Sequence, residues 1–195
     1  MTTSDVSGRL YLASDPDVVA AVVRHVTGAG TDQSEYDLTD EQAEKVRAAL
    51  DQVETSGALP DGVEAPTSAS YIIVRPLTDG ELLATEADPP FAAQYGAIVL
   101  ARVGQKAKGR GEDAVLAGLA GLPEKAEAAA RSQLAFQAKV RERQVALALV
   151  EIDGCKGAAE VQQYLSELDL NARAAVVREA AAHITRITKG QQGKA

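Results

Sequence analysis

A long helical pattern in the second half of the chain constrains the fold most strongly. The pattern opens at Pro123-Glu124 and continues to about residue 150, in a stretch rich in Ala, Glu, Gln, Lys and Arg, which all favour helix. One face of this stretch recurs at spacings of four and three residues, through Leu134, Ala138, Arg141, Val145, Leu149 and Ile152. The pattern therefore predicts a mainly α-helical protein.

A second helical seam ends the chain. It repeats in a heptad-like manner, with small residues in alternate places, through Leu170, Ala174, Val177, Ala181, Ile184 and Thr188. Asp153-Gly154 stops the preceding pattern, as a helix end or a turn would, and a short helix is expected at about residues 158–168.

Helix-start signals divide the first half of the chain. Ser14-Asp15-Pro16 predicts a helix that ends near Gly28, and capping boxes at Thr39–Gln42 and Thr78–Glu81 predict two more. A further helix is expected from residue 91 to about Gly104. Short apolar segments at Gly8–Leu12 and Tyr71–Val74 predict strands. We therefore expect a mainly α fold, a helical bundle with one or two short β-strands packed on the helices.

Charge and turn residues suggest how the chain is divided. Residues 1–66 hold 13 acidic and four basic side chains, a net charge of −9, whereas the remainder holds 15 and 16, a net charge of +1. Pro and Gly concentrate in residues 55–70, near the charge break. We therefore expect an acidic N-terminal helical subdomain (1–54), a linker (55–70), a main helical domain (71–188) and a flexible tail (189–195).

Composition excludes many classes of function. The chain of 195 residues carries a net charge of −8, so binding to nucleic-acid phosphates is not expected. It contains one Cys, two His and no Trp, which leaves few metal ligands and few groups for nucleophilic catalysis. The longest strongly apolar run, Val145–Val150, is too short to span a membrane, and no secretory signal pattern opens the chain. We expect a cytoplasmic protein.

No group of residues predicts an active site. His25 and His183 lie on different predicted helices without a sequence context for acid–base work, and Cys155 lies in a turn. The basic stretch from Arg102 to Arg110 is interrupted by glycines and is read as a solvated loop, without a phosphate-binding motif. The sequence thus predicts no catalytic, cofactor-binding or metal-binding residue, and no enzyme.

The chain from about residue 70 resembles the phage tail assembly chaperones. The similarity lies in the strand and capping box of Tyr71–Glu81, the helical middle, the apolar segment Leu147–Gly154 with its Asp-Gly turn, and a last helix with regularly placed Arg and Leu. The resemblance implies a non-enzymatic protein that holds a long helical tape-measure-type protein during tail assembly, in the host cytoplasm if the chain is phage-encoded. It also implies recognition of a helix in a groove.

The last helix is the expected partner-binding element. Its seam of Leu170, Val177 and Ile184 is predicted to contribute either to self-association or to a groove for the partner. Two other functions stay open from the residues alone: a structural virion component or adaptor, and an interaction module whose acidic N-terminal third docks on a basic protein.

Overall fold

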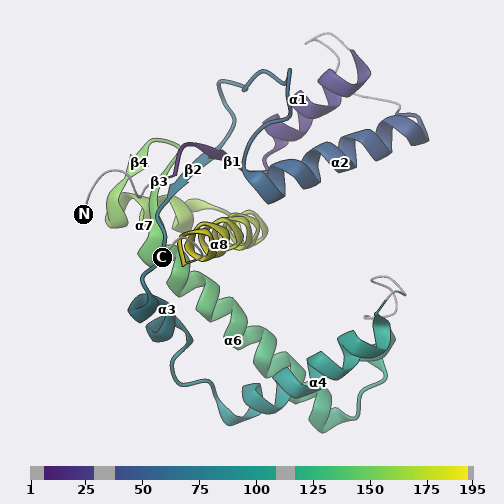
Figure 1. Cartoon of the computed structure of the whole chain (residues 1–195), viewed down its shortest axis with the longest axis vertical. Helices are drawn as coiled ribbons and strands as arrows, with labels where there is room; N and C mark the ends of the chain where they lie inside the picture. Colours follow the sequence, from purple (N-terminus) through teal and green to yellow (C-terminus); the bar gives the residue numbers. More distant parts are fainter. Residues whose placement is uncertain (1–6, 29–37, 109–116, 193–195) are drawn as a thin grey trace. The chain divides into compact units, whose positions relative to one another are not determined.

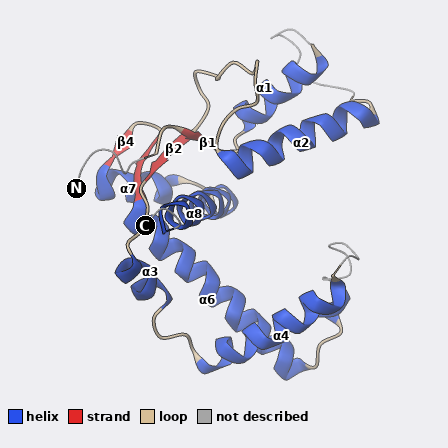
Figure 2. Ribbon diagram, in the orientation of Figure 1, coloured by secondary structure: helices blue, strands red, loops and turns tan. Residues whose placement is uncertain are grey.

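The protein divides into two compact units, one of which interrupts the other in the sequence. The computed structural model describes residues 7–28, 38–108 and 117–192. Residues 1–78 and 144–195 form one unit, which we call the sheet unit, and residues 79–143 form the other, the inserted unit. Helix makes up 69% of the described residues, which confirms the mainly α fold (Figure 2).

The sheet unit is built on a small antiparallel sheet of four strands, where the sequence predicted one or two. The strand order is β1-β2-β3-β4, from Leu10–Tyr11, Tyr71–Val74, Leu149–Ile152 and Cys155–Lys156 (Figure 1). Ile72 of β2 lies opposite Ile152 of β3, and neither side chain is exposed to solvent. The sheet therefore has one fully apolar face that helices must cover.

A two-residue turn joins β3 to β4. Asp153 and Gly154 both have positive φ angles, 48° and 81°, and Ile152 pairs with Cys155 across them. Two positive φ values in a two-residue loop match the twist of antiparallel strands, and Asp-Gly is a favoured pair for that turn. The turn predicted at these residues thus lies inside a hairpin rather than after a helix.

Four helices lie wholly within the described part of the sheet unit. They are α1 (Pro16–Thr27), α2 (Asp40–Ser56), α7 (Gly157–Glu167) and α8 (Leu170–Gln192). Helices α1 and α2 pack as a hairpin through buried valines that include Val22 and Val46. Helix α7 packs on β3 and β4, whereas α8 packs on β2 and α2 (Figure 1).

The N-terminal third is part of this unit rather than a subdomain of its own. Strand β1 pairs with β2, and the carboxylate of Glu179 in α8 accepts hydrogen bonds from the backbone N–H groups of Ala13 (2.7 Å) and Ser14 (3.1 Å). In the expected linker, Ala69 is buried, and the carbonyl of Ser56 accepts a hydrogen bond from Arg186 of α8 (3.0 Å). Strand pairing and hydrogen bonds between distant parts of the chain therefore join the segments on both sides of residues 55–70, where turn residues suggested a boundary.

The inserted unit contains helices α3 (Asp79–Glu86), α4 (Phe91–Ala107) and most of α6 (Glu124–Ala148). Helix α4 passes Gly104, where the sequence predicted its end, because Ala107 continues its buried face. Two of the basic residues expected in a loop, Arg102 and Lys106, therefore lie on this helix.

Two predictions at helix ends differ from the structure or lie partly outside it. Helix α6 ends at Ala148, and Leu149 and Ile152 belong to β3 instead of the helix face expected for them. Helix α8 continues to Gln192 through the first residues of the expected tail. Residues 109–116, which hold Arg110 of the basic stretch and the start of a helix expected at 112–121, lie outside the described residues, as do residues 193–195.

Candidate partner-binding surface

The structure does not bring the three predicted partner-binding residues together on one surface. Ile184 is fully buried and Val177 is 9% exposed, because this face of α8 covers the sheet unit's core. Leu170, at the first position of α8, is 83% exposed. Only Leu170 is accessible to a partner, so the seam is mainly a packing seam of the sheet unit.

A different helix presents an apolar face to solvent. Phe91, Tyr95 and Ile98 of α4 are 85%, 47% and 52% exposed, and they follow one another at spacings of four and three residues. Side chains at those spacings lie on one face of a helix. We call these three residues the exposed α4 face.

The opposite face of α4 is already committed to the inserted unit. Its buried residues are Ala93, Gly96, Val99, Val103 and Ala107. A Cβ atom on Gly96 would lie 2.0 Å from the backbone oxygen of Ala129 in α6, so the missing side chain is what lets the two helices approach this closely. Helix α4 therefore has two apolar faces, and one of them has no cover among the described residues.

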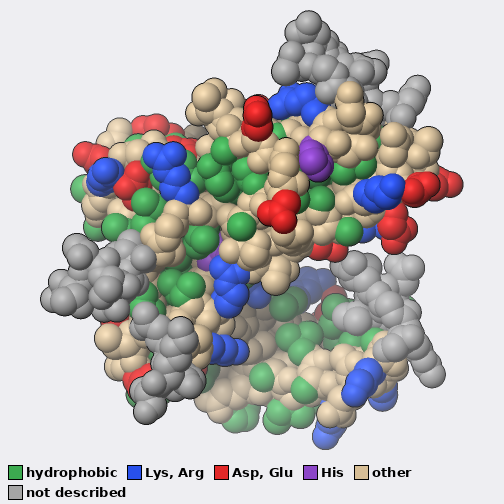
Figure 3. Space-filling model, turned by 45° about the horizontal axis from the view of Figure 1, so that its top comes forward, with side chains coloured by type: hydrophobic (Ala, Val, Ile, Leu, Met, Phe, Trp, Pro, Cys, Tyr) green, Lys and Arg blue, Asp and Glu red, His purple; other side chains and the backbone are tan. Residues whose placement is uncertain are grey.

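Large exposed apolar side chains are concentrated in the inserted unit. Among the described residues, five lie there and two in the sheet unit: Leu83, Phe91, Tyr95, Ile98 and Leu134 against Leu147 and Leu170. In the space-filling view, hydrophobic and basic side chains lie at the surface at the lower right (Figure 3). Single exposed apolar residues are ordinary, but an ordered helical row is typical of a contact surface.

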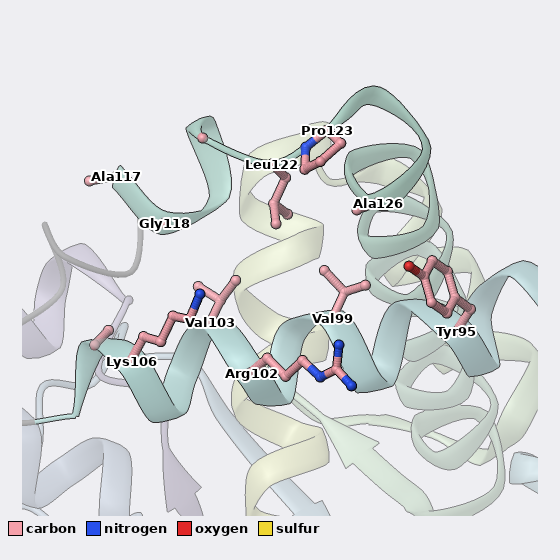
Figure 4. Close-up of a pocket in the computed structure, with 12 residues that line it drawn as sticks. Tyr95, Val99, Arg102, Val103, Lys106, Ala117, Gly118, Leu122, Pro123 and Ala126 are labelled. Carbon is pink, nitrogen blue, oxygen red and sulfur yellow. The ribbon is translucent and has the colours of Figure 1, made fainter.

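A cavity of about 580 Å³ adjoins the exposed α4 face. Val99 and Val103 of α4 point into it from one side, and Leu122 and Pro123 face them from the other (Figure 4). Tyr95 lines one end, so it belongs both to the exposed α4 face and to the cavity. We call this the α4 cavity.

Cationic side chains edge the α4 cavity. Arg102 and Lys106 line it, and both are exposed (Figure 4). Within the described residues neither of them forms an ion pair. Helix α4 itself carries these two cations and no acidic residue. The cavity thus offers an apolar floor beside positive charge.

The two residues that most resemble a catalytic pair are buried for structural reasons. Glu179 and His183 lie one turn apart on α8 and are each 1% exposed. Glu179 holds the backbone before α1, as described above, and both ring nitrogens of His183 are without a hydrogen-bond partner. Burial, with Arg186 nearby, lowers the pKa of His183 to about 4. An inaccessible neutral ring cannot reach a substrate.

A second polar cluster holds the sheet together. Asp153 accepts hydrogen bonds from the backbone N–H of Tyr71 (2.9 Å) and from the hydroxyl of Tyr164, while the hydroxyl of Tyr71 donates to Glu151 (2.7 Å). Burial, together with the hydrogen bond to Asp153, raises the pKa of Tyr164 to about 12. These bonds tie β2, the β3–β4 turn and α7 to one another, which accounts for the cluster without a ligand.

The other residues weighed from the sequence do not gather into a site. His25 is exposed on α1, and Cys155 is a free thiol paired with Ile152 across the hairpin. In the described part of the chain, His, Cys, Asp and Glu side chains form no group of three that could hold a metal ion. Over the same residues, no helix combines the length and the apolar character needed to cross a membrane.

Comparisons with protein families, with curated proteins and with solved structures find no match to this chain. The exposed α4 face is thus recognised from the structure alone. The sequence predicted a helix here but did not separate its faces: Phe91, Tyr95 and Ile98 follow helical spacing, and Ala93 and Gly96 between them mark a second face. Helix α4 thus carries apolar residues on two sides, and the buried side packs within the inserted unit.

Proposed function

We propose that this protein is a non-enzymatic phage tail assembly chaperone that holds a long helical protein of the tape-measure type through the exposed α4 face. The single observation that carries the proposal is the row formed by Phe91, Tyr95 and Ile98, an apolar helix face beside an open cavity. A partner helix would bury this row by helix-in-groove recognition. The resemblance of the chain from about residue 70 to the chaperone family supplies the nature of the partner. In this proposal the protein acts in the host cytoplasm.

The proposal is tested by co-expression with the tape-measure-type protein encoded in the same genome. The variant Phe91→Ser/Ile98→Ser removes most of the exposed α4 face and should lose at least about nine tenths of the co-purified partner, since central apolar anchors dominate such interfaces. Both side chains are exposed, so the fold should persist, and far-UV circular dichroism checks it.

A matched control separates this surface from the last helix. Leu170→Ser removes a leucine at the start of α8 that is about as exposed as Phe91, and it should leave co-purification unchanged. Partner recovery that is insensitive to Phe91→Ser/Ile98→Ser would contradict the proposal. Recovery of the protein in stoichiometric amounts from finished particles would favour the structural virion component instead.

The distribution of charge supports a second candidate, an acidic protein-interaction module. The sheet unit holds 19 acidic and 11 basic side chains, so it carries the whole net charge of −8, and Glu44, Asp51 and Glu54 are exposed on α2. Replacing all three residues (Glu44→Gln, Asp51→Gln and Glu54→Gln) should weaken a salt-sensitive contact with a basic partner. Deletion of residues 1–66 cannot test this candidate, because it would remove β1, α1 and α2 from the sheet unit.

A further inference from the structure

We infer that the α4 cavity selects the partner by charge, binding a helical segment that offers one apolar anchor side chain flanked by carboxylates. The inference rests on the proposed function and names the chemistry of the partner at that same surface. It would restrict the protein to acidic stretches of a long helical partner rather than to any apolar helix.

The size and lining of the cavity fit an apolar anchor. About 580 Å³ lies between α4 and residues 117–126, which is within the usual range for pockets that bury a compact group. Its floor includes Val99 and Val103, so an entering aliphatic or aromatic side chain would exchange contact with water for contact with apolar atoms.

The edge of the cavity supplies the charge preference. Arg102 and Lys106 lie one turn apart on α4, both exposed and both without an ion pair among the described residues. An apolar anchor in the cavity would bring the neighbouring residues of its helix to this edge. Carboxylates there would gain charge-assisted contacts, whereas lysines would meet like charges.

Tyr95 links the cavity to the exposed α4 face, because it lines the one and belongs to the other. A helix laid along α4 can therefore cover Phe91 and Ile98 while its next anchor enters the cavity. A second copy that docks through its own α4 fits the site less well, because that helix would add two cations and no carboxylate.

The test uses the full chain and two synthetic helical peptides of about 20 residues, long enough to form stable helix with helix-favouring sequences. Both carry leucines at i, i+4 and i+7, and they differ only in flanking Glu or flanking Lys. Fluorescence anisotropy at low salt should show the Glu peptide binding about five- to tenfold tighter, which is the effect expected of two partly exposed ion pairs. About 0.5 M salt should remove the preference.

Charge reversal at the cavity gives the decisive comparison. Arg102→Glu/Lys106→Glu should reverse the preference in favour of the Lys peptide. The control Lys139→Glu/Arg141→Glu makes the same change in net charge at exposed positions of α6 that do not line the cavity, and it should keep the original preference. Circular dichroism of each variant checks the fold.

Three results would overturn the inference: equal affinity for both peptides, a preference that Arg102→Glu/Lys106→Glu leaves in place, or no binding of either peptide. A concentration-dependent dimer that Phe91→Ser converts to monomer would also overturn it, because a second copy would then be the occupant. These failures are distinguishable from failure of the proposed function. Co-purification that requires Phe91 and Ile98 but ignores the charge reversal would leave the chaperone in place and remove only the charge selection.

Discussion

His183 is a histidine that the fold buries without giving its ring a hydrogen-bond partner. Burial lowers its pKa to about 4, below the ordinary value of 6.5, so the unfolded chain takes up a proton first as the pH falls. Above pH 6.5 the titration of His183 does not lower the free energy of unfolding. As the pH drops from 6.5 towards 4, it lowers that free energy progressively. The ring therefore makes the sheet unit sensitive to acid.

We predict that His183→Leu flattens the pH dependence of unfolding between pH 6.5 and 4.5. The wild type should lose roughly 1–2 kcal/mol more than the variant over that interval, since each pKa unit corresponds to about 1.4 kcal/mol. At pH 7 the variant should be as stable as the wild type or more so, because an apolar side chain leaves no buried nitrogen unpaired. Denaturant unfolding at a series of pH values measures both effects.

The variant His183→Gln separates the two causes. It removes the titrating ring but keeps a buried polar group, so the pH dependence should flatten without the gain at pH 7. Parallel stability curves for wild type and His183→Leu across the interval would show that His183 does not control the acid sensitivity.

Among the elements, α4 depends most on a single close approach. Gly96 must stay small where α6 crosses, whereas Gly104 is exposed and a Cβ atom there would meet nothing within 4 Å. The two glycines occupy the same helix, so they form a natural pair for comparison.

We predict opposite effects for Gly96→Ala and Gly104→Ala. The first should destabilise the inserted unit by roughly 1–3 kcal/mol, because a backbone oxygen blocks the new methyl group and the helices must separate. The second should stabilise it by about 0.5–1 kcal/mol, because alanine favours helix. Chemical denaturation followed by circular dichroism compares them, and equal shifts in the same direction would contradict the assigned packing.

Most helices could be predicted from the sequence because their ends carry local chemistry. Asp15 caps α1 and Thr39 forms the capping box of α2, as the sequence indicated. Strand β3 was missed because Leu149 and Ile152 fit the helical spacing that precedes them, and only the pairing with β2 decides between helix and strand. The Asp153-Gly154 pair, directly after Val150 and Ile152, was the available signal for the hairpin.

The candidate partner-binding surface could be predicted from the sequence less well than the helices. Periodicity shows that a helix has an apolar face, but it does not show which neighbour covers that face. Ile184 and Ile98 both occupy regular apolar positions, yet Ile184 is fully buried and Ile98 is 52% exposed. That difference depends on tertiary packing, which the spacing of apolar residues along the sequence does not show.

The whole molecule separates charge from exposed apolar surface. The inserted unit holds nine acidic and nine basic side chains, so it is neutral, and it contains most of the large exposed apolar residues among those described. The sheet unit carries the entire net charge. The exposed apolar side chains, which favour binding, thus lie mostly in the inserted unit, whereas the net charge, which favours dispersal in water, lies in the sheet unit.

We predict that the sheet unit folds without the inserted unit. Val74 pairs with Leu149 across the sheet, so the two cut ends lie near one another, and a short Gly-Ser linker in place of residues 79–143 should join them. The shortened chain should unfold cooperatively with its sheet intact, as judged by dispersed amide NMR signals, but it should not recover the partner. A collapsed spectrum without dispersion would show that the two units depend on each other.

The interrupted sheet also determines the order in which the protein can fold as it is synthesised. Strand β2 is complete once Val74 has been made, but β3 follows only after the 65 residues of the inserted unit, numbered 79–143. Glu179, which binds the backbone at Ala13, comes 166 residues after it. On the ribosome β1, β2 and the α1–α2 hairpin are made first, and the inserted unit, whose contacts lie within its own 65 residues, can form next, while pairing with β3 and the bonds from Glu179 come only with the end of the chain. The exposed α4 face is then present on the nascent chain before the sheet unit has completed its fold.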